Sequence, residues 1–192
     1  MQFKEPSRLD VFIHTVLLTR LMSRSYKKFA HMLDLKGDET VLDFGCGWGA
    51  LSRHIAPRLS ARGRLVGLDT SEAFTDVARK RLSKYPNVQF IVSDILRAGI
   101  EDETFDVIAI HLMLHDIAPD LRAKTVKALS RTLKADGRLF IKEPTKKRHG
   151  MTPAEIRQLM TDSRLQEVSG TDSRSILVGP FYAGVFKKPA SG

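Results

Sequence analysis

The sequence is poor in cysteine and has no long apolar run. Its 192 residues include one cysteine, Cys46, which cannot form a disulfide bond within the chain, so a fold held by internal disulfides is excluded. No apolar run approaches the roughly 20 residues that a membrane-spanning helix needs. We also find no cleavable secretory signal, no repeat and no low-complexity linker. We therefore expect one cytoplasmic domain over residues 1–192.

Acidic residues are too few to balance the basic ones, and the excess charge is uneven. The net charge is +9, of which residues 1–36 contribute +4 and residues 134–192 contribute +5, while residues 37–133 are neutral. Basic flanks can hold an anionic ligand or lie near phosphate or acidic lipid, and they can equally be a solvated surface. Peripheral membrane contact is therefore one of the alternatives.

Apolar periodicity predicts alternating strands and helices. Strands are expected at 40–44, 64–68, 88–92, 106–111 and 138–142, and helices at 50–59, 72–83 and 120–133. Thr70 or Ser71 can cap the second of these helices. Such alternation is typical of an α/β fold with a parallel sheet covered by helices on both faces. Ligands of such sheets bind beyond the carboxyl ends of the strands.

The two ends of the chain follow other patterns. Residues 9–34 are expected to be helical, and the helix carries an apolar stripe that either packs on the core or lies on a membrane surface. The stripe consists of Val11, Phe12, Val16, Leu17, Leu21 and Met22. Near the other end, Thr152-Pro153-Ala154-Glu155 predicts a helix to about residue 163. Strands near 165–169 and 176–186 follow, the second broken by Gly179-Pro180.

A glycine-rich turn, Gly45-Cys46-Gly47-Trp48-Gly49-Ala50, follows the first strand. Its spacing, with Asp69 at the end of the next strand, fits a dinucleotide site such as that for NAD. Asp43 argues against this ligand, because the pyrophosphate of a dinucleotide would lie close to its carboxylate. Two like charges about 4 Å apart repel by roughly 1 kcal/mol in water and roughly 4 kcal/mol at an effective dielectric of 20. A carboxylate there favours a ligand with an ammonium and a sulfonium, while the amides of the turn can hold the ligand's carboxylate.

Four motifs in order resemble a known family. Asp-x-Gly-Cys-Gly-x-Gly from Asp43, Gly67-Leu68-Asp69-Thr70-Ser71, Ser93-Asp94-Ile95, and Phe105-Asp106-Val107 with Leu114-His115-Asp116 look like class I S-adenosylmethionine-dependent methyltransferases, in particular the small quinone-C-methylase-like group. The match covers about residues 38–143. It implies a Rossmann-like, mostly parallel seven-stranded sheet with an antiparallel last strand. Residues 1–37 would form a helical cap, 38–143 the cofactor-binding core, and 144–192 the elements that complete the sheet.

The resemblance also assigns residues to the cofactor. The part of S-adenosylmethionine derived from methionine would be lined by Asp43, Gly45, Cys46, Gly47, Trp48 and Gly49. Asp69 would bind the ribose diol, with Thr70 and Phe74 at the adenine. Asp94 and the backbone of Ile95 would contact the adenine amino group. Trp48 departs from the family pattern and is similar to the cyclopropane-fatty-acid-synthase branch, which makes lipid-like substrates an option beside simple packing of the indole.

Methyl transfer requires above all that the acceptor atom is aligned with the methyl group of the sulfonium. A base is needed only when the acceptor must lose a proton. His111, at the end of the fourth strand, is the candidate base or a residue lining the cofactor. Glu143 ends the fifth strand and can contact the substrate or a loop. His115 and Asp116 match a position that supports a loop. No metal site is expected.

The resemblance therefore implies a methyltransferase for a small-molecule acceptor, anionic or lipid- or quinone-like, with S-adenosylhomocysteine as the product. An RNA or protein methyltransferase is one alternative, suggested by the basic composition. Nucleic acid is not favoured, because His111-Leu112-Met113-Leu114 stands where base-amine methylases have Asn-Pro-Pro-aromatic. An NAD-binding protein or a catalytically silent cofactor-binding protein is the second alternative. The sequence does not identify the acceptor or the oligomeric state.

Overall fold

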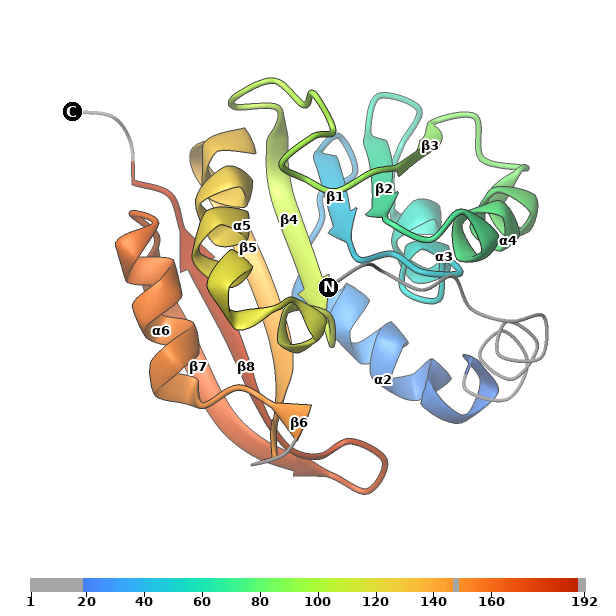
Figure 1. Ribbon diagram of the computed structural model, residues 1–192. Coiled ribbons are helices and arrows are strands. Elements are labelled where there is room, and N and C mark those ends of the chain that lie inside the picture. The colour runs from blue at the N-terminus through green and yellow to red at the C-terminus, as the bar shows by residue number, and fades with distance from the viewer. Residues whose placement is uncertain (1–18, 147–148, 190–192) are drawn as a thin grey trace. The chain divides into compact units, whose positions relative to one another are not determined.

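The computed structural model describes residues 19–146 and 149–189 (Figure 1). Its contacts divide the chain into two compact units, residues 1–98 and 99–192, and each unit is described by itself. That residues 1–192 act as one domain stays a prediction.

The first unit contains a parallel sheet of three strands in the order β3-β2-β1. These strands are β1 (Thr40–Phe44), β2 (Arg64–Asp69) and β3 (Val88–Val92). Their pairing places Val41 beside Leu65, and Leu65 beside Val88. β1 and β2 are almost wholly buried, which explains their continuous apolar runs. The three strands predicted here are confirmed to within a residue.

Helices α2 (Thr19–Met32), α3 (Ser52–Ile55) and α4 (Glu72–Leu82) complete the first unit, together with the 3₁₀ turn η2 (Ala56–Arg58). Ser71 is the N-cap of α4, since its hydroxyl accepts a hydrogen bond from the Phe74 amide at 3.2 Å. The helix predicted at 50–59 is shorter than expected. Pro57 lies in the 3₁₀ turn that follows α3.

Of the predicted apolar stripe, only Leu21 and Met22 lie within the described residues, and they differ, because Met22 is partly buried and Leu21 is exposed. Helix α2 buries Tyr26, Phe29 and Ala30, whereas Leu21 is 53% exposed. Leu21 precedes Tyr26 by five positions, which turns it about 140° away from that buried side chain on a helix. Val11, Phe12, Val16 and Leu17 lie outside the described residues.

The second unit contains a sheet with strand order β4-β5-β8-β7. The strands are β4 (Phe105–His111), β5 (Leu133–Lys146), β7 (Gln166–Ser175) and β8 (Gly179–Lys187), with the short β6 (His149–Gly150) paired to β5. β4 and β5 are parallel, and β8 is antiparallel to both β5 and β7. The predicted antiparallel last strand is confirmed.

Two strand boundaries in this unit differ from the prediction. β7 and β8 form a long hairpin, and Gly179-Pro180 begins β8 instead of breaking it. Pro180 sits at the second position of the strand, where a missing N–H is tolerated. β5 begins earlier than residue 138, because Leu133 already pairs with Phe105 before an irregularity in the ladder that ends at Arg138.

Helices α5 (Pro119–Thr132) and α6 (Pro153–Asp162) pack together in this unit, and η3 (Leu114–Asp116) is a single 3₁₀ turn. Thr152 caps α6 as predicted, since its hydroxyl accepts from the Glu155 amide at 3.1 Å. The core of the unit is apolar and contains Ile108, Ile110, Val126, Leu129, Leu139, Ile141, Ile156, Met160, Tyr182 and Phe186. In the described part of the chain, no helix combines the length and the apolar character that crossing a bilayer requires.

Candidate functional site

The carboxyl ends of β1, β2 and β3 meet at one edge of the first unit's sheet. The amides of Gly45 and Cys46 donate to the Leu68 carbonyl at 2.8 and 3.2 Å, and the Ser93 amide donates to the Asp69 carbonyl at 2.9 Å. These bonds gather the three loops that follow the strands. All the predicted cofactor residues except His111 belong to these strand ends or to the beginning of α4.

The glycine turn depends on backbone conformations that other residues rarely adopt. Gly45, Gly47 and Gly49 have φ values of +71°, +49° and +74°. At Gly49 an added Cβ would also lie 3.0 Å from Leu82 Cδ1 and 3.1 Å from Ala78 Cβ, both on α4. At Gly47 no atom lies within 4 Å of an added Cβ. Gly47 thus supplies conformation alone, and Gly49 supplies conformation together with close packing.

Asp69 ties the glycine turn to the loop before α4. Its Oδ2 accepts from the Gly47 amide at 2.8 Å, and its Oδ1 accepts from the Ser71 amide at 2.9 Å. A carboxylate has about four acceptor positions. Asp69 can therefore hold the turn and still accept hydrogen bonds from a diol.

Asp43 is a carboxyl group buried at the end of β1. It is 2% exposed, and the Ser52 hydroxyl donates to its Oδ2 at 2.6 Å. Burial raises the pKa of Asp43 to about 7; the Ser52 hydrogen bond opposes this rise and the negative charge of Asp69 adds to it. A cation placed against Asp43 would favour its ionised form. The environment therefore suits a positively charged ligand group.

Trp48 connects three parts of the first unit. Its indole N–H donates to the Thr19 hydroxyl on α2 at 2.7 Å, and its ring centroid lies 5.3 Å from that of Phe74 on α4. Arg81 donates to the Trp48 carbonyl at 3.0 Å. Sequence reasoning did not single out Thr19 or Arg81, because nothing in a linear pattern links them to a tryptophan about 30 positions away. These contacts agree with a packing role for the indole.

The other candidates in this unit differ in exposure. Cys46 is buried, and burial with the negative charges of Asp43 and Asp69 raises the pKa of its thiol, so a reactive role is not supported. Asp94 is exposed, and its Oδ1 accepts from the Leu96 amide at 2.9 Å. Ile95 beside it is buried. Thr70 is partly exposed at the end of β2.

In the second unit, Glu143 holds the loop that follows β4. The side chain is fully buried, and its Oε1 accepts from the amides of Met113 and Leu114 at 2.9 and 2.7 Å. Its Oε2 accepts from the His115 amide at 3.3 Å and lies 2.6 Å from His115 Nδ1. One carboxylate thus satisfies the first amides of η3 and orients an imidazole.

His115 is consequently part of a polar network. Burial lowers its pKa, but the hydrogen bond and the charge of Glu143 outweigh this effect, so the pKa is raised above 6.5. Arg122 donates to the His115 carbonyl at 2.9 Å and to Glu155 on α6 at 2.7 Å. The predicted supporting role of the His115-Asp116 segment agrees with this geometry.

His111 ends β4, paired in the ladder with Lys142 of β5. Burial and the Lys142 charge lower the pKa of His111 to about 3, so its imidazole is neutral at neutral pH. The next residue, Leu112, has a φ of +58°, and its amide donates to the Lys142 carbonyl at 2.8 Å. A leucine in this conformation is strained, and such strain is concentrated at functional sites.

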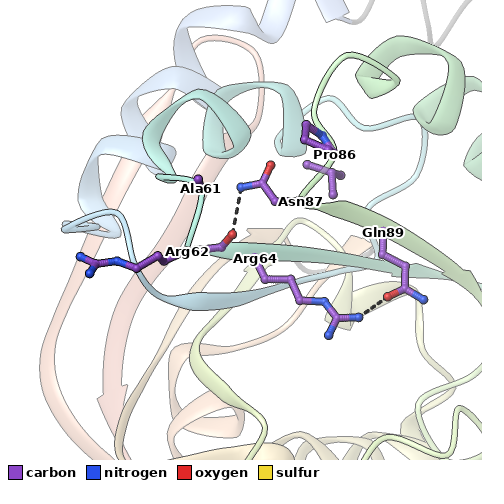
Figure 2. A pocket seen from close by; sticks show the side chains of 8 residues that line it. Ala61, Arg62, Arg64, Pro86, Asn87 and Gln89 are labelled. Atoms are coloured by element: carbon purple, nitrogen blue, oxygen red, sulfur yellow. Dashed lines mark hydrogen bonds between the residues drawn. The ribbon is translucent and has the colours of Figure 1, made fainter.

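A separate open hollow of about 550 Å³ lies at the amino ends of β2 and β3 (Figure 2). Its polar side chains are hydrogen-bonded within the protein, and Arg62 pairs with Asp38 outside the hollow. Asn87 donates to the Ser60 and Gly63 carbonyls at 3.0 and 2.9 Å, and Arg64 donates to Gln89. None of the predicted site residues lines it. Ligands of parallel sheets bind at the opposite edge, so the hollow is not the candidate site.

Metal binding was also considered. Within residues 19–146 and 149–189, no group of three His, Cys, Asp or Glu side chains is arranged to hold a metal ion.

Comparison with known proteins gives a family match. Residues 41–137 match the family model described as "Methyltransferase domain". The 2-phytyl-1,4-naphtoquinone methyltransferase of Thermosynechococcus vestitus is 34% identical over 109 residues, which cover 57% of this chain and 48% of the relative. The chain spans about half the length of the curated quinone methyltransferases that it matches.

Solved structures show the fold. The [4+2]-cyclase SpnF has a TM-score of 0.78 at 13% identity, covering 90% of this chain and 82% of that one. The 1,6-didemethyltoxoflavin-N1-methyltransferase of Burkholderia thailandensis, solved with its substrate and S-adenosylhomocysteine, has a TM-score of 0.73 at 15% identity, covering 98% and 93%. The predicted Rossmann-like fold is therefore confirmed. Since a cyclase shares it, the fold alone does not define the reaction.

Proposed function

Because the chain belongs to the methyltransferase domain family, we propose that it binds S-adenosylmethionine and transfers the cofactor's methyl group to a small lipid- or quinone-like acceptor. The observation that supports this proposal most concerns Asp43. This buried carboxyl group has a pKa of about 7 and directly precedes a glycine turn that Asp69 holds. A cationic ligand group would stabilise the ionised form of that buried carboxyl group, whereas a diphosphate would destabilise it.

The residues present fit the cofactor. Asp43 would hold its ammonium, and Asp69 would accept from its ribose hydroxyls. The amides of Gly45, Cys46, Gly47 and Gly49 already donate hydrogen bonds within the protein, so they shape the turn instead of binding the cofactor's carboxylate. Phe74 offers aromatic surface for adenine, and Trp48 packs beside it. When bound, the cofactor supplies a methyl group already activated by the sulfonium. The protein must then align the acceptor and keep water away.

Isothermal titration tests the cofactor. We expect S-adenosylmethionine and S-adenosylhomocysteine to bind, and NAD not to bind. The affinity for S-adenosylmethionine should rise about tenfold between pH 5.5 and 7, because the ionised form of Asp43 binds the ammonium. Asp43→Asn should bind more weakly and lose this pH dependence. Tight NAD binding without binding of either sulfur ligand would overturn the proposal.

For the acceptor, the quinone-methylating relative supports an apolar, ring-containing or lipid-like molecule. Transfer of a labelled methyl group to reduced naphthoquinones and to total RNA distinguishes the two substrate classes. Labelled quinone with unlabelled RNA supports the proposal. Labelled RNA alone would make the chain an RNA methyltransferase instead.

In the transfer step, His111 and Glu143 have different proposed roles. His111 is neutral, and with a pKa of about 3 it is a weak base, so we assign it acceptor orientation through hydrogen bonding and only weak proton acceptance. Glu143 acts as a positioning residue through η3 and His115. His111→Ala should lower kcat without introducing a new ionisation into the pH profile between 5 and 8.

A further inference from the structure

The hairpin of β7 and β8 ends in an exposed apolar tip. Ile176 is fully exposed and Leu177 is 45% exposed. The tip is defined by the structure on both sides, because Ser175 pairs with Gly179 and the Ser175 hydroxyl accepts from the Leu177 amide at 3.3 Å. The turn that contains these two residues closes the long ladder between β7 and β8 (Figure 1).

Positive charge surrounds this apolar tip. Arg174 is exposed one residue before the turn. Lys146 of β5 lies beside Gly179, the first residue after the turn. Its Nζ is 3.2 Å from the position that a Cβ would occupy at Gly179. The sequence from Ser173 to Phe181 contains no acidic residue, and neither does the sequence from Pro144 to Lys146. The tip therefore combines two aliphatic side chains with cations, and the nearest acidic residues along β7 and β5 are Asp172 and Glu143.

The tip lies at the carboxyl end of β5. β8 runs antiparallel to β5, so Phe181 near the start of β8 pairs with Pro144 near the end of β5. Carboxyl ends of parallel strands are where ligands of such sheets bind. A surface that contacts the tip would therefore lie at the same end of the second unit's sheet as His111 on β4 and Glu143 on β5.

We propose that the β7–β8 tip inserts Ile176 and Leu177 into an anionic lipid surface, with Arg174 and Lys146 at the lipid headgroups. Exposed aliphatic side chains beside cations match the acyl boundary and the negative headgroups of such a surface. A protein partner fits less well, because β7 is polar apart from Val168 near its other end and offers no continuous apolar face around the tip. This proposal goes beyond methyl transfer and does not depend on it.

Vesicle flotation of the full chain tests the proposal. Vesicles of phosphatidylcholine are compared with vesicles that contain about 30% phosphatidylglycerol. The wild-type chain should float with the anionic vesicles, and added salt should weaken the binding. Ile176→Asp combined with Leu177→Asp should lower the partition coefficient at least about tenfold, and Arg174→Gln with Lys146→Gln should lower it by a similar factor.

A matched control lies on the same strand. Val168 is 64% exposed near the other end of β7, so Val168→Asp adds a charge to the same hairpin away from the tip and should leave flotation unchanged. Thermal unfolding of each variant, followed by circular dichroism, separates loss of lipid contact from loss of folding without relying on the proposed reaction. Wild-type flotation by the tip variant, equal loss in Val168→Asp, or binding to neutral vesicles only would each overturn the proposal.

Discussion

At the scale of single residues, Asp43 shows a conflict between stability and ligand binding. In an unfolded chain its pKa is near 3.8, and in the folded chain it is about 7. The folded state thus holds the proton more tightly, so the free energy of unfolding decreases as pH rises from about 4 to 7. The shift corresponds to about 4 kcal/mol once the group is fully ionised.

Asp43→Asn should therefore stabilise the ligand-free protein. We expect a gain of about 2–4 kcal/mol at pH 8 and almost none at pH 4, because asparagine avoids burying a charge and can still accept from Ser52. Denaturant unfolding at the two pH values measures the difference. Ser52→Ala serves as the control and should destabilise the protein at both. Equal stability of wild type and Asp43→Asn at pH 8 would contradict the pKa of about 7.

His115 gives a second pH-dependent prediction, of the same sign but at higher pH. Since its folded pKa is raised, the interaction with Glu143 stabilises the fold fully below pH 6.5 and is lost as pH rises through the folded pKa. A ¹H–¹³C NMR titration of the imidazole should give a pKa above 6.5. Glu143→Gln should lower that pKa, because the charge is removed. A wild-type midpoint at or below 6.5 would show that burial dominates.

At the scale of elements, the glycine turn and α4 depend on each other. Gly49→Ala should destabilise the protein by about 2–4 kcal/mol, because a methyl group at a positive φ also meets Leu82 and Ala78. Gly47→Ala has the conformational penalty alone and should cost about 1 kcal/mol. Thermal unfolding of the two variants measures both effects. Equal losses would mean that the contact with α4 is unimportant.

The C-terminus of α6 contains a position that the sequence does not optimise. Arg164 follows the C-cap Ser163 with a φ of +61°, and the amides of Arg164 and Leu165 bond to the Thr161 and Met160 carbonyls. Glycine is preferred at this position. Arg164→Gly should stabilise the protein by about 1 kcal/mol. Arg164→Ala keeps the Cβ and should not, so equal unfolding midpoints for the two variants would refute the explanation.

Local patterns predicted β1 to β4 because these strands are short, mainly apolar runs bounded by turn residues. They failed where pairing between distant segments determines where a strand begins. Gly179-Pro180 has the local chemistry of a break, yet the hairpin with β7 and the ladder with β5 place it at the start of β8. The early start of β5 likewise depends on pairing with Phe105.

At the scale of the whole molecule, ligand binding should raise thermal stability. S-adenosylhomocysteine at about 100 times its Kd adds about 2.7 kcal/mol to the free energy of unfolding. For a chain of 192 residues this corresponds to a rise in Tm of about 5–10 °C. Differential scanning fluorimetry measures the shift, with NAD as the control. A similar shift with NAD would point to nonselective binding of adenosine.

The candidate site in the first unit was predictable because its residues occur in compact motifs along the chain, and the resemblance to the methyltransferase family is confirmed. The contacts that hold these motifs were not. Thr19 meets Trp48, and Glu143 binds the amides of residues 113–115, across about 30 positions with no periodic signal. The acceptor depends on residues outside the motifs, which is why the motifs predict the cofactor better than the acceptor.

The two hydrogen bonds that Asp69 accepts within the first unit bear on how its substitution should be interpreted. Replacing it would remove a ribose contact and loosen the Gly47 amide at once, so weaker binding would not reveal which loss is responsible. A thermodynamic cycle that pairs Asp69→Asn with a 2′-deoxy form of the cofactor separates them. If the two losses add, the carboxylate acts mainly on the turn; if they do not, it acts on the sugar.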